Sequence, residues 1–200
     1  MGTYGGPQIV KDGLVFAIDP ANSKSYAGTG TALKDLAGRG HHPTFNTAPT
    51  HSNRKFGISQ NTGAWEYVGA IAPSSTCTVQ LWMETDDIKA LFLKGNNNSS
   101  YYLGAFRAAN KEYYAGCGSP DFFVNAVEVS NIYDNIRGNV WRMLEWKNVD
   151  FSIWTRFGFS YYTNYKFNST TTIGEWRIYD RNLTAAESLQ NYNATKNRYI

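Results

Sequence analysis

Apolar residues occur along the chain in short runs that turn-forming residues separate. The run Leu14–Ile18 contains five apolar residues between Lys11-Asp12-Gly13 and Asp19-Pro20, which predicts a buried strand. Further segments of β-type composition, each expected to form a strand, are residues 65–68, 76–83, 88–93, 101–106, 112–116, 122–124, 126–129, 141–146, 153–159 and 173–179. Short strands at this spacing, without helices between them, favour an all-β antiparallel β-sandwich of jelly-roll type over a parallel sheet.

The N-terminal segment and one long loop lack the periodicity of strands. Residues 1–8 are rich in glycine and are expected to form an arm that precedes the domain. Residues 19–50 are rich in Asn, Ser, Gly, Thr and Pro, with Leu33 and Leu36 as isolated apolar anchors, which predicts a long ordered loop. Because no linker or internal repeat divides the chain, residues 9–200 are interpreted as a single domain.

The C-terminal segment has a helical signature. Thr184 and Glu187 have the spacing of a capping box, in which a threonine begins a helix and a glutamate three residues later bonds back to it. This spacing predicts a short helix over residues 184–196. Leu189 and Tyr192 give the segment an apolar stripe, so we expect the helix to pack through that stripe onto one face or edge of the sandwich.

The composition agrees with a β-rich protein and limits the kinds of partner that we expect it to bind. Of 200 residues, 42% are hydrophobic and 16% aromatic, whereas only 18% are charged, a balance that favours strands. The formal net charge of +3 is not concentrated, since the densest basic pair is Arg54-Lys55, so no nucleic-acid partner is expected. No apolar stretch approaches the roughly 18 residues that cross a bilayer, so no membrane partner is expected. Cys77 and Cys117 are expected to be isolated buried thiols in a protein made in a reducing cytoplasm.

Candidate catalytic groups are sparse. The nearest acidic cluster, Glu84-Thr85-Asp86-Asp87, lacks the E-x-D-x-x-E spacing that places two carboxylates on one strand face in glycan hydrolases. Cys117 lies between glycines that could expose its thiol, but the sequence places no activating base nearby. The sequence therefore predicts a protein that is not an enzyme.

Metal sites have little support either. The three histidines are His41, His42 and His51, and none has a cysteine neighbour, so a zinc site with four ligands is not expected. Candidate oxygen ligands for a structural calcium ion are Asp19, Asp35 and Asp134. These carboxylates are scattered without a ligand spacing, so no cofactor is predicted, and a structural calcium ion stays the alternative.

Tyrosines in polar, loop-like segments have the chemistry of a saccharide site. Sugar rings stack their apolar faces on aromatic side chains, while side-chain amides bond to their hydroxyl groups. The candidate glycan-binding residues are Tyr101, Tyr102, Tyr161, Tyr162 and Tyr165. The competing interpretation places these aromatic side chains in the core or in a protein interface, where Tyr and Trp are also enriched.

Several segments together resemble a known fold family, the concanavalin A-like (laminin-G-like) jelly-roll domains. The similar segments are residues 13–19, 22–26, 28–31, 35–41, 65–68, 78–83, 175–187 and 190–196. The most similar part is the closing E-W-R-I-Y-D-R-N-L-T-A-A-E at residues 175–187. Two segments depart from the family pattern: Gly38-Arg39-Gly40 stands where Gly-Asn-Gly is common, and residues 141–146 replace a W-H-H-V-A strand. The resemblance implies a jelly-roll sandwich with a short C-terminal helix.

The closing segment also resembles domains that tailed bacteriophages encode, because it continues into N-Y-N-A-T-K. That resemblance implies a non-enzymatic virion structural protein that decorates or cements the capsid, assembled in the host cytoplasm. The expected partners are the major capsid protein, other virion proteins and further copies of this chain. The candidate interface residues are Tyr4, Pro7, Trp141, Trp146 and Trp154. The alternative is a carbohydrate-binding, lectin-like module of a tail or fibre that attaches to surface glycans of the host.

Overall fold

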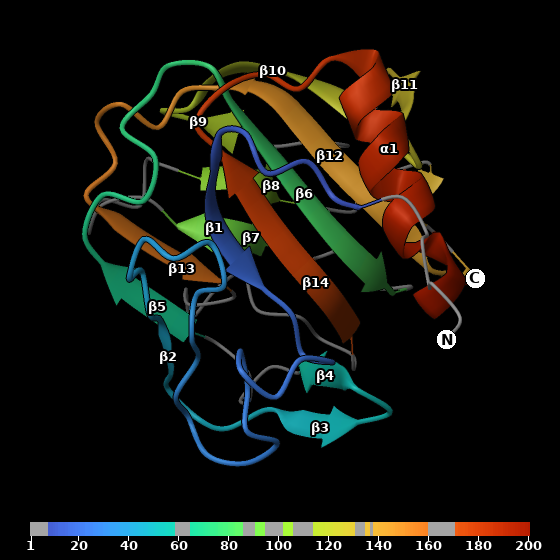
Figure 1. Ribbon diagram of the computed structural model, residues 1–200. Helices are drawn as coiled ribbons and strands as arrows, with labels where there is room; N and C mark the ends of the chain where they lie inside the picture. Colours follow the sequence, from blue (N-terminus) through green and yellow to red (C-terminus); the bar gives the residue numbers. More distant parts are fainter. Residues whose placement is uncertain are drawn as a thin grey trace.

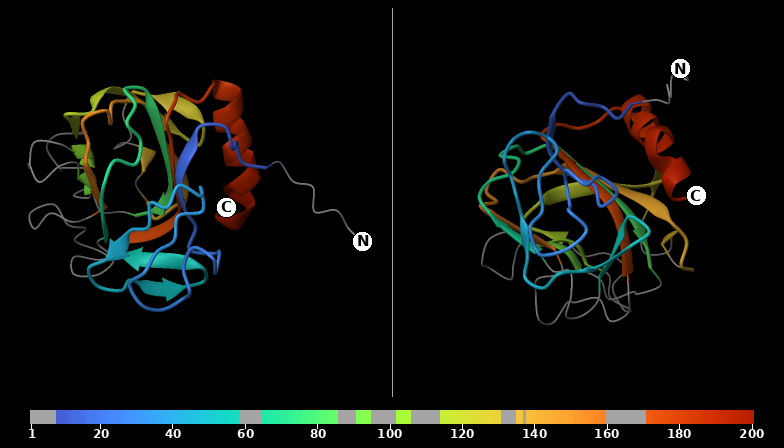
Figure 2. Two further views of the ribbon diagram at one scale, coloured as in Figure 1. Left: turned by 60° about the vertical axis from the view of Figure 1, so that its left-hand side comes forward. Right: turned by 60° about the horizontal axis from the view of Figure 1, so that its bottom comes forward.

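The computed structural model describes residues 8–58, 65–85, 91–94, 102–105, 114–130, 135–136, 138–159 and 171–200. Within these ranges the chain forms two antiparallel β-sheets, the helix α1 (Ala185–Thr195) and a short 3-10 helix, η2 (Lys196–Arg198). The predicted all-β sandwich with a short C-terminal helix is therefore confirmed. Figure 1 shows α1 lying across the larger sheet, and Figure 2 shows that α1 covers the face turned away from the smaller sheet. No helix in the described part of the chain is long and apolar enough to span a membrane.

The larger sheet, sheet A, contains eight strands within the described residues. These are β1 (Leu14–Ile18), β3 (Thr50–Ser52), β4 (Lys55–Ile58), β6 (Cys77–Glu84), β10 (Gly118–Val124), β11 (Val127–Val129), β12 (Arg142–Val149) and β14 (Thr171–Tyr179). Their order across the sheet is β11-β10-β12-β6-β14-β4-β3. β1 and β4 pair with different parts of β14, so β14 joins the first strand of the chain to the centre of the sheet.

The smaller sheet, sheet B, contains six strands among the residues that the structure describes. These are β2 (Thr44–Phe45), β5 (Trp65–Val68), β7 (Leu91–Lys94), β8 (Tyr102–Ala105), β9 (Tyr114–Ala115) and β13 (Arg156–Phe159), in the order β2-β5-β13-β7-β8-β9. The strands predicted over residues 101–106 and 112–116 correspond to β8 and β9, which pair with each other antiparallel. The strand predicted over residues 153–159 begins only at Arg156, because Trp154 donates its backbone N–H to the Phe151 carbonyl in a turn (3.0 Å).

Alternation along β6 separates the two faces of sheet A. Val79, Leu81 and Met83 point into the core between the sheets, whereas Gln80 and Trp82 point toward α1. Because α1 covers the outer face, both faces of β6 are buried. Because both faces are covered, almost every residue of β6 is buried, and the strand does not alternate between buried apolar and exposed polar residues.

The core between the two sheets is rich in aromatic side chains. Phe16 lies 5.8 Å from Trp65 and 6.2 Å from Trp176, measured between ring centroids, and the two tryptophan rings lie 4.7 Å apart. These rings come from β1, β5 and β14, so they tie the first strand, sheet B and the centre of sheet A together. Aromatic pairs at these separations contribute attraction beyond their buried area.

Three predicted interface residues lie in the interior instead. Trp146 and Trp154 are each 1% exposed and belong to the core between the sheets. Trp141 is 7% exposed and packs with Trp82 and Met143 on the outer face of sheet A. These three side chains therefore pack in the interior and are not exposed for contact with a partner. Tyr4 and Pro7 lie outside the described residues.

The helix α1 begins as predicted, and of its two predicted packing residues Tyr192 stacks on Trp82 of β6 (5.8 Å between ring centroids). The Thr184 hydroxyl accepts from the Glu187 N–H (3.2 Å), and the Glu187 carboxylate accepts from the Thr184 N–H (2.8 Å), so the capping box is present. Leu189, however, is 50% exposed, so the predicted apolar stripe is wrong at that position. The buried face carries Ser188, Asn191 and Thr195, because the part of sheet A beneath the helix presents polar groups.

The long loop that follows β1 is ordered around Asp35, as its composition predicts. One carboxylate oxygen of Asp35 accepts from the backbone N–H groups of Ala17 (2.9 Å) and Ala37 (2.8 Å), and the other accepts from the Arg39 N–H (3.1 Å). Leu33 is buried and Leu36 is half-buried, so both anchor the loop to the sandwich. The carboxylate therefore replaces secondary structure as the partner of three backbone donors.

The hairpin between β3 and β4 was not visible in the sequence. Its two turn residues, Asn53 and Arg54, have φ angles of 51° and 62°. Positive φ at both central positions is typical of a type I′ turn, which usually carries Asn-Gly. Arg54 occupies the position where glycine is usual, so the sequence did not indicate this turn. Residues with a side chain seldom adopt a positive φ.

Neither cysteine forms a disulfide, and both are buried. The prediction of isolated buried thiols is confirmed, and the idea that flanking glycines expose Cys117 is wrong, since Cys117 is 0% exposed. Burial raises the pKa of the Cys77 thiol to about 12. A thiol with such a pKa is almost wholly protonated at neutral pH, so Cys77 is a small core residue and not a nucleophile.

Candidate functional site

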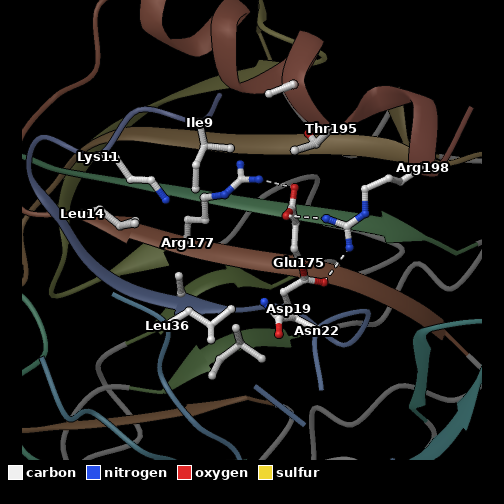
Figure 3. A pocket seen from close by; sticks show the side chains of 13 residues that line it. Ile9, Lys11, Leu14, Asp19, Asn22, Leu36, Glu175, Arg177, Thr195 and Arg198 are labelled. Atoms are coloured by element: carbon white, nitrogen blue, oxygen red, sulfur yellow. Dashed lines mark hydrogen bonds and ion pairs between the residues drawn. The ribbon is translucent and has the colours of Figure 1, made fainter. Parts of the chain in front are cut away.

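A cleft on the outer face of sheet A brings charged and apolar side chains together (Figure 3). It has a volume of about 270 Å³ and lies between β1, β14, the segment before β1 and the C-terminal end of α1. The residues that carry its chemistry are Ile9, Lys11, Leu14, Asp19, Asn22, Leu36, Glu175, Arg177, Thr195 and Arg198. The cleft therefore joins residues from both ends of the chain.

A row of alternating charges forms one wall of the cleft. Arg198 donates to the Glu175 carboxylate (3.0 Å) and to the Asp19 carboxylate (2.6 Å), and Arg177 donates to the other oxygen of Glu175. Figure 3 shows Arg177, Glu175 and Arg198 in this order along the wall. Each charge has an opposite neighbour, so the wall is polar and fixed in position without being strongly charged.

Apolar side chains lie beside the charged row. Ile9 precedes β1, Leu14 opens β1, and Leu36 comes from the long loop. In the view of Figure 3, Ile9 and Leu36 lie on opposite sides of the row. Lys11 is exposed at the rim, and within the described residues its ammonium group forms no ion pair. The cleft thus offers an apolar surface, fixed hydrogen-bonding groups and one free cation.

A buried polar network beneath α1 holds this wall in place. Arg177 donates to the Gln80 side-chain carbonyl (3.3 Å), and Asn191 of α1 donates to the same oxygen (3.0 Å). The Gln80 amide in turn donates to Glu145, a carboxylate that is 0% exposed and that Lys147 approaches at 3.5 Å. Burial of these groups is tolerated because each is hydrogen-bonded or ion-paired.

The network also fixes the chain before β1. The Val10 N–H donates to the Asn191 side chain (2.8 Å), and the Tyr179 hydroxyl donates to the Val10 carbonyl (3.2 Å). Gln190 adds a bond to the Gln8 carbonyl (2.7 Å). Desolvation by burial raises the pKa of the Tyr179 hydroxyl, so it remains a protonated donor at neutral pH. Ile9 and Lys11 are positioned on the cleft because their neighbour Val10 is held at both of its polar atoms.

The arrangement is suited to binding rather than to acid–base chemistry. A glycoside hydrolase needs one carboxyl group that is protonated and another that is free to attack or to activate water. In the cleft both carboxylates, Asp19 and Glu175, are held by guanidinium groups. Glu84, the acidic residue singled out in the sequence, ends β6 away from this cleft, and Asp86 and Asp87 lie outside the described residues.

The candidate metal ligands are not gathered at one place. His41 contacts the Tyr67 hydroxyl (3.0 Å), His42 accepts from the Asp35 N–H (3.1 Å), and His51 bonds to the Pro20 carbonyl (2.9 Å). Asp19 and Asp35 are engaged as described above, and Asp134 lies outside the described residues. Within the described ranges, no three His, Cys, Asp or Glu side chains are grouped so that they could hold a metal ion.

The candidate glycan-binding tyrosines do not line the cleft. Tyr101, Tyr161, Tyr162 and Tyr165 lie outside the described residues, and Tyr102 is described only as part of the backbone of β8. Of the residues that do line it, the sequence pointed to Asp19 as a candidate calcium ligand and to Leu36 as a loop anchor, but not to a shared site. One signal was present, because Glu175 and Arg177 are two residues apart in a segment that is otherwise apolar, which places both on one face of a strand.

Comparisons with known proteins support the fold. No protein-family model matches the chain, and no curated protein matches it in sequence. Among solved structures, the binding domain of botulinum neurotoxin DC in complex with SialylT superposes with a TM-score of 0.56 and 12% identity. It is matched over 92% of this chain and 52% of the neurotoxin chain.

Two further structures give the same result. Trypanosoma rangeli sialidase in complex with sialic acid superposes with a TM-score of 0.57 and 12% identity, over 94% of this chain and 34% of the sialidase. The binding domain of Paraclostridial Mosquitocidal Protein 1 gives a TM-score of 0.55 and 13% identity, over 94% of this chain and 53% of that one. At this identity the likeness shows the β-sandwich fold alone, and this chain spans about a third to a half of those proteins.

Proposed function

We propose that this protein is a non-enzymatic, lectin-like module and that the cleft on the outer face of sheet A binds a saccharide unit. The observation that carries the proposal is the composition of the cleft, in which Ile9, Leu14 and Leu36 lie beside the fixed polar row of Arg177, Glu175 and Arg198. Saccharides present apolar C–H faces and hydroxyl groups on the same ring, so they need both kinds of surface in one place.

The size and rigidity of the cleft fit this function. Its volume of about 270 Å³ lies below the range of roughly 300–1,000 Å³ that holds drug-sized ligands, which suits a single sugar ring. The polar groups are already held by neighbours, so little side-chain entropy is lost when a ligand binds. Structures of the same fold include proteins solved with sialic acid or with SialylT, which agrees with a carbohydrate-binding role.

The test begins with a screen of neutral and acidic oligosaccharides for binding to the purified protein. A saccharide that binds is then titrated by calorimetry into the wild type and into Lys11→Ala, which removes the free cation at the rim. We expect Lys11→Ala to weaken binding at least about fivefold, since one charge-assisted hydrogen bond is lost. Lys24→Ala is the matched control, because Lys24 is also exposed but does not line the cleft.

The same samples test the absence of catalysis. Incubation of the bound saccharide with protein is expected to release no new reducing ends over hours. Turnover that Glu84→Gln abolishes would contradict the non-enzymatic proposal. If Lys11→Ala and the wild type bind the saccharide with equal affinity, the cleft is not the binding site.

We also propose that the module acts on the virion of a tailed bacteriophage, as a capsid decoration protein or as part of a tail or fibre. The resemblance of residues 175–196 to phage-encoded domains supports this location. Leu189 on α1 and Val127 on β11 are 50% and 65% exposed, and large exposed apolar side chains favour contacts with other virion proteins. Quantitative mass spectrometry of purified particles tests the virion location. A copy number near that of the major capsid protein indicates capsid decoration, and a far lower copy number indicates a place in the tail or a fibre. Absence of the protein from the particles contradicts the virion location.

A further inference from the structure

Two hollows continue from the saccharide cleft along the outer face of sheet A, toward the β3–β4 hairpin. The nearer hollow, which we call the notch, has a volume of about 160 Å³ and is lined by Ala21, Asn53, Arg54, Lys55, Arg198 and Tyr199. The second, which we call the groove, has a volume of about 510 Å³ and shares Asn53 and Lys55 with the notch. Arg198 also lines the saccharide cleft, so the three hollows adjoin one another in a row.

The groove is built by the register of four neighbouring strands. Thr50, Gly57, Thr172 and Glu84 lie directly opposite one another across β3, β4, β14 and β6. Residues in such a row point to the same face, and the glycine leaves a depression between the two threonines. Three strand spacings of about 4.8 Å make the row roughly 14 Å long. It therefore presents hydroxyl groups and one carboxylate along a strip that matches the hydroxyl groups of a saccharide chain.

The notch gathers positive charge. Arg54, Lys55 and Arg198 line the same small hollow, and no acidic side chain lines it. Arg198 is neutralised by Asp19 and Glu175, but within the described residues neither Arg54 nor Lys55 forms an ion pair. Glu84 lines the groove together with Lys55, but among the described residues no ion pair joins the two side chains. Like charges placed together repel one another, and a bound anion relieves that repulsion.

One of the two free cations, the ammonium group of Lys55, is also held in position by aromatic rings. The Lys55 ammonium lies 4.3 Å from the centroid of the Trp141 ring and 5.6 Å from that of Tyr199. Both rings are held by stacking, since Tyr199 lies 4.5 Å from Trp82 and 4.8 Å from Trp141. Arg54 follows Asn53 in the tight turn with positive φ. Cations that are ordered before a ligand arrives bind it at a lower entropic cost.

We propose that the notch is an anion subsite and that the ligand of this protein is an acidic saccharide, whose carboxylate lies against Arg54 and Lys55. The neighbouring sugar units then lie along the groove on one side and in the cleft on the other. This inference rests on the proposed glycan-binding function and adds the class of the saccharide. It differs from binding of a simple anion, because the groove with its hydroxyl row adjoins the notch.

The experiment compares one saccharide backbone in two charge states. Oligogalacturonate and its methyl ester are titrated by calorimetry into the wild type and into the double variant Arg54→Gln/Lys55→Met, which keeps the side-chain stems and removes both charges. We expect the wild type to bind the acid at least about tenfold more tightly than the ester, as a charge-assisted bond to a carboxylate predicts. The double variant is expected to bind both forms with the affinity that the wild type has for the ester.

The control variant Lys24→Gln/Lys34→Met removes two exposed lysines elsewhere and lowers the net charge from +3 to the same +1 (three minus two). It is expected to keep the preference for the acid. If the control variant loses the preference as well, overall charge explains it and the subsite is overturned. Equal binding of acid and ester by the wild type also overturns the subsite, while the glycan-binding function stands. If neither form binds and the oligosaccharide screen finds no ligand, the proposed function fails together with this inference.

Discussion

The two faces of sheet A differ in the polar groups that they bury. The inner face meets sheet B through aliphatic and aromatic side chains such as Leu81, Trp146 and Trp176. The outer face meets α1 and the chain before β1 through an aromatic cluster around Trp82 and also through a polar strip that includes Gln80, Glu145 and Arg177. The same strands supply both sets, because neighbouring residues of a strand point to opposite faces.

The difference shows how one sheet can serve for both stability and recognition. Apolar burial is not directional, so the inner core holds the two sheets together without specifying polar geometry. A buried polar network adds little net stability, because desolvation offsets the gain from its bonds, but it allows few alternative arrangements. In this protein it fixes α1 and Val10 and, through them, the side chains that line the cleft.

The largest expected effect comes from the inner core. Phe16→Ala removes a ring that is 0% exposed and that contacts both Trp65 and Trp176. We expect the free energy of unfolding to fall by about 3–5 kcal/mol, as for other large core truncations. Urea unfolding followed by tryptophan fluorescence measures this change, and Phe16→Leu should lose less. A loss below about 1 kcal/mol for Phe16→Ala would mean that the inner core does not dominate stability.

The second prediction contrasts two neighbouring positions of α1. Asn191→Leu makes the helix more apolar, but it leaves the Val10 N–H and the Tyr179 hydroxyl without their Asn191 bonds. We expect a loss of about 2–3 kcal/mol, since unsatisfied buried polar groups are costly. Leu189→Asn should change the free energy of unfolding by less than about 0.5 kcal/mol, because Leu189 is half exposed. The reverse order of the two effects would restore the apolar-stripe interpretation.

Hydrogen exchange sharpens the same contrast. In Asn191→Leu the Val10 amide is expected to lose protection while amides of β6 keep theirs, since only the outer layer is disturbed. Equal loss of protection in both places would show that the outer layer and the inner core unfold as one unit.

The smallest expected effect lies at the start of α1. Hydrogen bonds from Arg181 and from Thr184 hold the pKa of the Glu187 carboxyl at about 2, below its usual 4.5. A depressed pKa stabilises the folded state above the unfolded-state value, and the contribution disappears as pH falls from 4.5 through 2. We expect Glu187→Gln to cost about 1 kcal/mol at pH 7 and almost nothing near pH 2. Urea unfolding at both pH values measures it, and a cost that does not change with pH would be the contrary result.

The sequence predicted the parts that depend on local signals. The apolar run at residues 14–18 predicted a strand, and the spacing of Thr184 and Glu187 predicted the start of a helix. Both elements are present in the structure. The sandwich itself followed from the spacing of short strands. The outer layer could not be predicted, because Val10 and its partner Asn191 are 181 positions apart and neither is unusual for its own segment. The burial of Leu189 was predicted wrongly for the same reason. The face of the helix that packs is decided by side chains of sheet A that are distant in the sequence.

The candidate site shows a similar division. Tyrosine-rich segments gave a chemically reasonable set of glycan residues, but the cleft is formed by Lys11, Glu175, Arg177 and Arg198, which come from distant segments. Arg54-Lys55 was noted only as the densest basic pair. Its placement against Trp141 and Tyr199 depends on the turn at Asn53 and on the C-terminal residues that return to sheet A.

The most direct test of the account is to map where an acidic saccharide binds. The amide chemical shifts of ¹⁵N-labelled wild-type protein are recorded during titration with oligogalacturonate. The account predicts that the largest changes cluster along one path on the outer face of sheet A, at Lys11, Asn22, Asn53–Lys55 and Arg198. Changes centred on Tyr101 and Tyr161–Tyr165 instead would contradict it and return the site to the tyrosine segments that the sequence suggested.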